Sequence, residues 1–229
     1  MIPVLICPVV SRFDLLERMF DSIDHPVGRL VIVDNSCSGY QRDGAEIIRP
    51  ITGLGYPGGI NAGILQTPDA PWWMWASADL VFGPGDLERI AGFMERAEGP
   101  RHVTGSHRGL RNVYGAMNAA TVDAIGLFDD WAFYPIYFDD DDYEYRCRLG
   151  GVEWVTYDGT MTHAGSATIN SDGWLARANS RTFRMNRDRY IAKWGGAPGS
   201  ECFSRPYNLD VPLSYSAPDI AGRAMRLWK

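Results

Sequence analysis

The first 35 residues of the chain alternate between strand-like and helix-like patterns. Residues 4–10 form a short apolar run, and apolar side chains then recur at helical spacing over residues 13–23. A β-branched run follows at residues 29–34 and ends in Asn35 and Ser36, which is a turn signal. Strands that are connected through a helix pair in parallel, because the helix carries the chain back to the starting edge of the sheet. The pattern therefore predicts a β-α-β unit of the size that binds a mononucleotide.

The rest of the chain continues this alternation. The further elements that the pattern predicts are a strand at 46–49, a glycine-rich loop at 53–59, a helix from about Ile60, a buried central strand at 72–76, a helix at 86–96, a strand at 113–117, a helix at 142–150, a strand at 152–157 and a long helix at 174–194. A length of 229 residues with 45% hydrophobic residues suits a single α/β domain. We expect a Rossmann-like, mostly parallel sheet flanked by helices in residues 1–195. Residues 196–229 are expected to form a helical or irregular C-terminal extension, with a weak helical pattern at 220–227.

Charge and hydropathy exclude several classes of partner. The formal net charge of -6 argues against nucleic-acid binding, because the phosphate backbone rewards clustered Lys and Arg. The apolar run at residues 4–10 is too short to cross a bilayer and carries no basic leader. We therefore expect a cytoplasmic protein that has no transmembrane segment.

Polar residues follow several of the predicted strands. Residues 8–12, Asp34 with Asn35, and Asp79 all come directly after apolar strand patterns. Ligands of open α/β sheets bind beyond the carboxyl ends of the strands, so these residues are expected to face one crevice.

Four successive aspartates, Asp139 to Asp142, are the strongest local signal in the sequence. Adjacent carboxylates repel one another, so they need a cation, water or raised pKa values. One interpretation is the start of a helix, with the acids offsetting the helix dipole and Asp142 pairing with Arg146. The other is a functional acidic site, and the cluster alone favours neither.

Four other features are weaker on their own. Asp79 ends an apolar strand, where a ligand of a hard cation would be placed, although turn formers are common there. His163 follows a predicted strand, and a structural histidine is the simpler interpretation. The glycine-rich segment at 53–63 lacks the P-loop ending and the dinucleotide spacing, which disfavours an ATPase or a dehydrogenase. A basic stripe on the last helix, formed by Arg177, Arg181 and Arg184, is either a solvated face or a site for phosphates or an anionic acceptor.

Taken in order, these segments resemble family 2 glycosyltransferases of the GT-A fold, especially the rhamnosyl- and galactofuranosyltransferase-like branch. The resemblance extends from about residue 4 to 195. It is carried by Ile32 to Ser36, Gly55 to Gly63, Ala76 to Asp79, Gly126 to Asp129, Asp139 to Asp142 with Arg146, His163 with Ser166, and Met185 to Gly195.

The resemblance implies a role for each matching position. Asp34 would bind the base or ribose of the nucleotide, with Pro8 and Val10 lining the base pocket. The remaining residues of the donor site would be Asn35, Gly59, Asn61 and Ser77. Asp79 and His163 would bind Mn²⁺ or Mg²⁺, and Asp140 would be the catalytic base of an inverting transfer from a nucleoside-diphosphate sugar to an acceptor hydroxyl.

One position departs from the pattern of the family. Ser77 occupies the first position of the DxD motif of the family, so metal ligation is expected to depend on fewer carboxylates than usual.

The acceptor site has three candidate residues. Asp139, Asp142 and Trp131 are candidates for contacts with a glycan, protein or small-molecule acceptor, since aromatic rings offer apolar faces to sugars. For Asp142 the alternative is a purely structural role, and for Trp131 it is core packing.

Two rival functions remain open at this point. A nucleotide-sugar hydrolase or nucleotidyltransferase would use the same crevice and carboxylates, and acceptor-dependent product formation would distinguish a transferase. A binding module that keeps the fold without turnover is the non-enzyme alternative, and Ser77 is the departure that motivates it.

Overall fold

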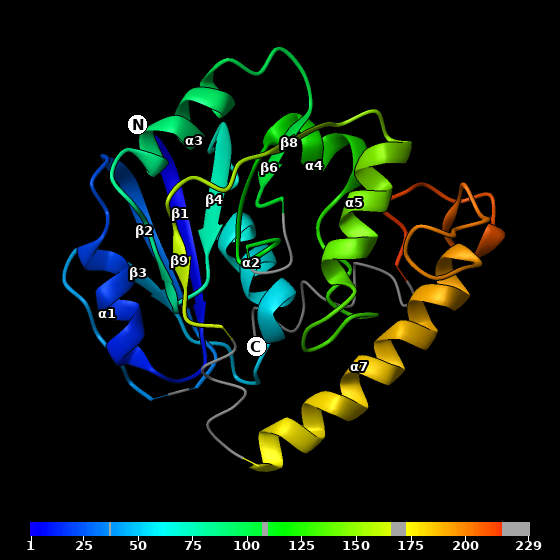
Figure 1. Cartoon of the computed structure of the whole chain (residues 1–229), viewed down its shortest axis with the longest axis horizontal. Coiled ribbons are helices and arrows are strands. Elements are labelled where there is room, and N and C mark those ends of the chain that lie inside the picture. The colour runs from blue at the N-terminus through cyan, green and yellow to red at the C-terminus, as the bar shows by residue number, and fades with distance from the viewer. Residues whose placement is uncertain (37, 107–109, 166–172, 217–229) are drawn as a thin grey trace.

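The computed structural model describes residues 1–36, 38–106, 110–165 and 173–216 (Figure 1). Its helices are α1 Phe13–Asp21, α2 Gly55–Gln66, α3 Asp86–Glu95, α4 Ala119–Ile125, α5 Asp139–Leu149, α7 Gly173–Trp194 and the 3₁₀ turn η1 Pro206–Asn208. Its strands are β1 Ile2–Val9, β2 Val27–Asp34, β3 Ala45–Ile48, β4 Trp72–Ala76, β5 Leu80–Val81, β6 Arg101–Thr104, β7 Tyr114–Asn118, β8 Glu153–Thr156 and β9 Thr162–His163. Within these ranges no helix is both long and apolar enough to cross a membrane.

One seven-stranded sheet organises the molecule, in the order β3-β2-β1-β4-β7-β6-β8. Only β7 runs antiparallel to its neighbours β4 and β6, while the other pairs are parallel. A second sheet contains two short antiparallel strands, β5 and β9. This arrangement confirms the expected α/β fold with a mostly parallel sheet.

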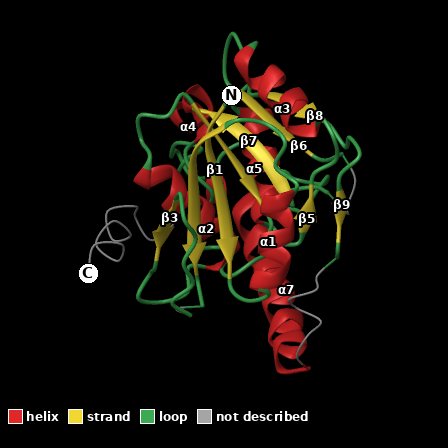
Figure 2. Ribbon diagram, turned by 90° about the vertical axis from the view of Figure 1, so that its left-hand side faces the viewer, coloured by secondary structure: helices red, strands yellow, loops and turns green. Residues whose placement is uncertain are grey.

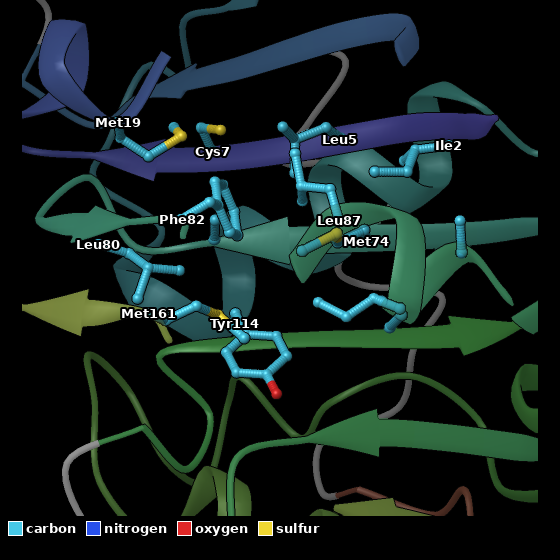
Figure 3. Close-up of a cluster of buried hydrophobic side chains, with 14 of the residues drawn as sticks. Ile2, Leu5, Cys7, Met19, Met74, Leu80, Phe82, Leu87, Tyr114 and Met161 are labelled. Carbon is cyan, nitrogen blue, oxygen red and sulfur yellow. The ribbon is translucent and has the colours of Figure 1, made fainter. Parts of the chain in front are cut away.

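Each face of the sheet carries its own apolar core. Alternate residues of the central strand β4 point to opposite sides, so Met74 packs in one core and Trp75 in the other. Helices α1 and α3 cover the first face, where Leu5, Met19 and Leu87 lie together (Figure 3). Helices α2, α4 and α5 cover the second face. Figure 2 shows α1 lying over the sheet and the first turns of α7 extending beyond it.

Helix α2 begins at Gly55, five residues before the expected start, and so absorbs most of the predicted glycine-rich loop. The reason is close packing against β1. A Cβ atom at Gly59 would lie 2.8 Å from Pro8, and one at Gly63 would lie 2.5 Å from Ile6. The glycines therefore let this helix approach the strand, which a pattern of propensities alone does not reveal.

Residues 196–216 pack onto the body of the protein. The backbone carbonyl of Trp194 accepts hydrogen bonds from the N–H groups of Cys202 and Phe203, and Tyr145 on α5 donates to the carbonyl of Phe203. Leu213 packs beside two of the apolar cores. The predicted helical pattern at 220–227 lies outside the described residues.

Candidate functional site

The carboxyl ends of β1, β2 and β4 form one edge of the sheet, and Asp34 ends β2 there. Its buried carboxylate accepts hydrogen bonds from the backbone and side chain of Ser36 and a longer one, 3.3 Å, from Ser38. The guanidinium of Arg49 lies 3.8 Å away. Nearby on β1, Pro8 is buried, whereas Val10 just beyond the strand is exposed.

Two of the predicted donor-site amides are engaged inside the fold. Asn35 accepts a 2.9 Å hydrogen bond from the backbone N–H of Leu54, just before α2. Asn61 is buried and pairs with both backbone groups of Phe128, at 2.9 and 3.1 Å. This differs from the expectation of direct donor contacts, because both polar atoms of Asn61 are already bonded to the backbone. Gly59, which faces Pro8, likewise serves helix packing.

Ser77, Asp79 and His163 form a hydrogen-bonded group at the end of β4. Asp79 is buried, and its Oδ1 atom lies 2.5 Å from Ser77 Oγ and 3.1 Å from His163 Nε2. Strand β9 brings His163 there by pairing with β5. Burial raises the pKa of Asp79, but the hydrogen bonds from His163 and Ser77 outweigh it, so the pKa is lowered overall.

Asp79 Oδ1 and His163 Nε2 are atoms of types that can ligate a metal ion. Among the described residues, no group of three or more His, Cys, Asp or Glu side chains lies close enough to hold a metal ion. Ser166, which the sequence motif pairs with His163, lies outside the described part. A hollow of about 230 Å³ opens beside Asp79 and His163, and Arg18 of α1 also lines it.

Residues 112 and 113, just before β7, connect this group to the acidic cluster. The backbone carbonyl of Val113 accepts a 2.7 Å hydrogen bond from the N–H of Ser77. The side chain of Asn112 donates a 2.9 Å bond to Oδ2 of Asp139. Half-buried Tyr56 donates to the Asn112 carbonyl at 2.9 Å. Asp79 and the acidic cluster therefore lie on the two sides of one backbone segment.

The four aspartates form the first turn of α5, which confirms the helix-start interpretation. Arg111 supplies the cation that the cluster needs: its guanidinium lies 3.7 Å from Asp140, 2.9 Å from Asp141 and 2.5 Å from Glu144. Burial nevertheless raises the pKa of Asp140 against the opposing charge of Arg111. Burial and the charge of Asp140 raise the pKa of Asp139 well above its ordinary value and that of Asp141 to about 6.

Asp142 belongs to a buried ionic network and does not face the crevice. It lies 2.8 Å from Arg146 and 2.7 Å from Lys193, and it accepts a hydrogen bond from the indole of Trp194. Lys193 also contacts Asp129 at 2.9 Å. Of the two expected roles for Asp142, the structure supports tying α5 to α7.

Trp131, the aromatic acceptor candidate, lies among aromatic residues that differ in exposure. Trp131 and Tyr134 are exposed, by 40% and 47%, whereas Phe133 is buried in the core between α5 and α7. The basic stripe of α7, Arg177, Arg181 and Arg184, is exposed.

No protein-family model and no curated protein matches this sequence. Solved structures do match. A mannosyltransferase from Pyrobaculum calidifontis, solved with GDP-Man and Mn²⁺, superposes with a TM-score of 0.61 at 15% identity, over 86% of this chain and 65% of that one. Glucosyl-3-phosphoglycerate synthase from Mycobacterium tuberculosis, with Mn²⁺, UDP and phosphoglyceric acid, gives 0.53 at 17% identity, over 79% and 76%. TarS from S. aureus, with UDP-GlcNAc, gives 0.55 at 12% identity, over 83% and 67%.

The chain has the GT-A fold of these glycosyltransferases. It spans about 65% of the length of the mannosyltransferase. The group at Asp79 lies at the carboxyl end of β4, and Asn112 joins the acidic cluster to it; open α/β sheets in general bind ligands at this edge. The sequence patterns did not indicate three residues that connect the group at Asp79 to the acidic cluster, namely Arg111, Asn112 and Tyr56. The one signal for them was a polar Arg-Asn pair directly before the predicted strand at 113–117.

Proposed function

We propose that this protein is a metal-dependent, inverting glycosyltransferase that moves a sugar from a nucleoside-diphosphate sugar to an acceptor hydroxyl. We further propose that it belongs to family 2, in the rhamnosyl- and galactofuranosyltransferase-like branch. One observation carries the proposal: the Asp79–His163 pair and the acidic cluster are joined through residues 112 and 113 at the ligand-binding edge of a GT-A fold.

In this proposal the nucleotide crosses the carboxyl end of β1. Asp34 and the segment from Pro8 to Val10 line the base and ribose, because β2 and β1 end side by side, with Val9 in register with Asp34. The diphosphate then reaches the group formed by Ser77 and Asp79 at the end of β4. The P. calidifontis, M. tuberculosis and S. aureus structures contain GDP-Man, UDP and UDP-GlcNAc, which supports a nucleotide sugar as the donor.

Asp79 and His163 are the residues that would hold Mn²⁺ or Mg²⁺. Their ligating atoms, Oδ1 and Nε2, are 3.1 Å apart, which is close to the separation of adjacent ligands that each lie about 2.1 Å from one ion. Two protein ligands leave positions for diphosphate oxygens and water, as is usual for cations that bind nucleotides. When bound, such a cation neutralises the charge that develops on the departing nucleoside diphosphate.

Asp140 is the proposed catalytic base. As the acceptor oxygen attacks the anomeric carbon, the carbon–oxygen bond to the diphosphate breaks and the acceptor proton passes to the Asp140 carboxylate. The side chain is 27% exposed, so substrate can reach it. Burial raises the pKa of Asp140, and the charge of Arg111 opposes that rise without cancelling it. The neighbouring Asp139, whose pKa is raised much further, is suited to a protonated, positioning role.

Trp131 and Tyr134 are the proposed acceptor platform, because both are exposed and aromatic rings offer apolar surface to a sugar. The acceptor classes that fit are a glycan, a protein or a small molecule. The test is an incubation of the protein with Mn²⁺, a panel of UDP-, GDP- and dTDP-sugars, and a panel of methyl glycosides. Glycoside product that requires both donor and acceptor is expected. Equal diphosphate release without any acceptor would favour the hydrolase, and binding without release would favour a binding module.

A further inference from the structure

Arg18 lies on the α1 side of the hollow beside Asp79 and His163. It stands three residues after Leu15 on α1, so the two side chains share one helix face, and both line this hollow. Leu15 is buried while Arg18 is exposed, which leaves the guanidinium at the mouth of the hollow. Among the described residues, no carboxylate lies within ion-pair distance of Arg18.

Charged residues close to Arg18 in the sequence, and Asp79 in the hollow itself, have partners of their own. Arg12 is held by Asp14 through two hydrogen bonds of 2.9 and 2.7 Å. Glu17, next to Arg18 in the sequence, is bonded to Tyr40 and Arg42. Asp79 is bonded to Ser77 and His163. Arg18 is therefore an exposed positive charge that lines the hollow and has no carboxylate partner in the described part of the chain.

We propose that Arg18 binds the diphosphate group of the nucleotide donor and stabilises the departing nucleoside diphosphate. This inference rests on the proposed function, since it assigns a part of the same donor site. It also explains how a site with Ser77 in place of a carboxylate handles its ligand. A second carboxylate at position 77 would bring positive charge to the diphosphate by binding the metal ion more tightly. Arg18 brings positive charge to the diphosphate itself.

The chemistry of arginine suits this role. The guanidinium is always charged and presents several donors that match phosphate oxygens, and its planar fork can bind two of them at once. The charge of a nucleoside diphosphate is concentrated at its terminal phosphate. Arg18 should therefore distinguish a diphosphate from a monophosphate of the same nucleoside.

The test measures binding by calorimetry. The nucleotides UDP, UMP, GDP, GMP, dTDP and dTMP are titrated into the unmodified protein and into Arg18→Gln, with and without Mn²⁺. We expect the preferred diphosphate to bind about tenfold more weakly to Arg18→Gln, while the matching monophosphate binds equally well to both proteins. Arg18→Lys should recover part of the loss. Arg89→Gln, which removes an exposed arginine of α3, should behave like the unmodified protein.

The possible results distinguish a wrong role for Arg18 from a wrong function for the protein. If Arg18→Gln binds the diphosphate as tightly as the unmodified protein does, the inference about Arg18 is wrong and the proposed function stands. If the unmodified protein binds none of the six nucleotides, the proposed function is wrong and the inference falls with it. An equal loss of monophosphate and diphosphate affinity would also contradict the inference, because it would place Arg18 away from the terminal phosphate.

Discussion

Asn112 donates a hydrogen bond of 2.9 Å from its side chain to Oδ2 of Asp139, the first residue of α5. The same residue has a positive φ of 53°, its N–H donates to Thr104 and its carbonyl accepts from Tyr56. Asparagine tolerates this left-handed conformation better than most residues. Asn112 thus combines an unusual backbone geometry with contacts that hold the acidic cluster beside the strand ends.

Replacing Asn112 separates these two contributions. Asn112→Gly keeps the backbone conformation accessible but removes the side-chain donor, whereas Asn112→Ala removes the donor and adds backbone strain. We expect both variants to lose turnover to a similar extent, and the alanine variant to be less stable by about 1 kcal/mol. Urea unfolding and diphosphate release measure the two effects. Full turnover in Asn112→Gly would show that the bond to Asp139 is dispensable.

Lys193 should be essential to stability, because it contacts two buried carboxylates, Asp129 at 2.9 Å and Asp142 at 2.7 Å. Lys193→Met leaves Asp129 without its buried cation, and removing one partner of a buried pair typically costs about 3–5 kcal/mol. We expect the urea midpoint to fall strongly or the protein to remain unfolded. Arg187→Met, which breaks an exposed pair with Asp188, is the control and should change little. An unchanged midpoint for Lys193→Met would contradict the account.

The raised pKa of Asp141, about 6, predicts a pH-dependent stability. In the unfolded chain the pKa is about 3.9, so between these values the folded state binds the proton more tightly. The free energy of unfolding should therefore fall as the pH rises from about 4 to 6, by on the order of 1–2 kcal/mol. Asp141→Asn should flatten this fall and raise stability at pH 7, whereas Asp123→Asn at an exposed site should not. Urea unfolding at each pH provides the measurement.

Arg111 should set the pH at which Asp140 becomes an active base. Its positive charge opposes the effect of burial on the pKa of Asp140, so Arg111→Gln raises that pKa further. We expect the acid limb of the rate profile to move to higher pH in Arg111→Gln and to stay near its original position in Arg111→Lys. A drop in rate that is uniform across pH would instead assign Arg111 a structural role only.

The fold could be predicted from the sequence because its main strands and helices have clear apolar patterns. The run Trp72–Ala76 has apolar side chains for both faces and forms the central strand as predicted. Helix α2 begins at Gly55, earlier than the sequence pattern predicts. The reason is that glycines that permit helix–strand contact look like loop glycines in the sequence. Strands β5 and β9 have two residues each, which is too short for any periodicity to show.

The residues of the candidate site could be predicted only in part from the sequence. Asp79 and His163 are recognisable as candidates because each follows a strand pattern, and Asp140 because it belongs to a run of four aspartates. Arg111 and Asn112 lie in a stretch without periodicity, and their importance arises from contacts with residues about 30 positions later. The role of Asn61 also depended on such a partner, the backbone of Phe128, which its position in the motif could not indicate. The pairing of Asp142 with Arg146 follows from their i,i+4 spacing, whereas its contact with Lys193 on α7 does not.

The most direct test of the account compares the unmodified protein with Asp140→Asn in acceptor-dependent diphosphate release from UDP-, GDP- and dTDP-sugars, with Mn²⁺ and the panel of methyl glycosides. The asparagine keeps the size of the side chain but cannot accept the proton of the acceptor hydroxyl. We predict turnover of one donor by the unmodified protein, loss of at least about a hundredfold in the variant, and unchanged binding of the nucleoside diphosphate. Equal turnover by both proteins, or none by either despite nucleotide binding, would contradict the assignment of Asp140 as the base of a glycosyltransferase.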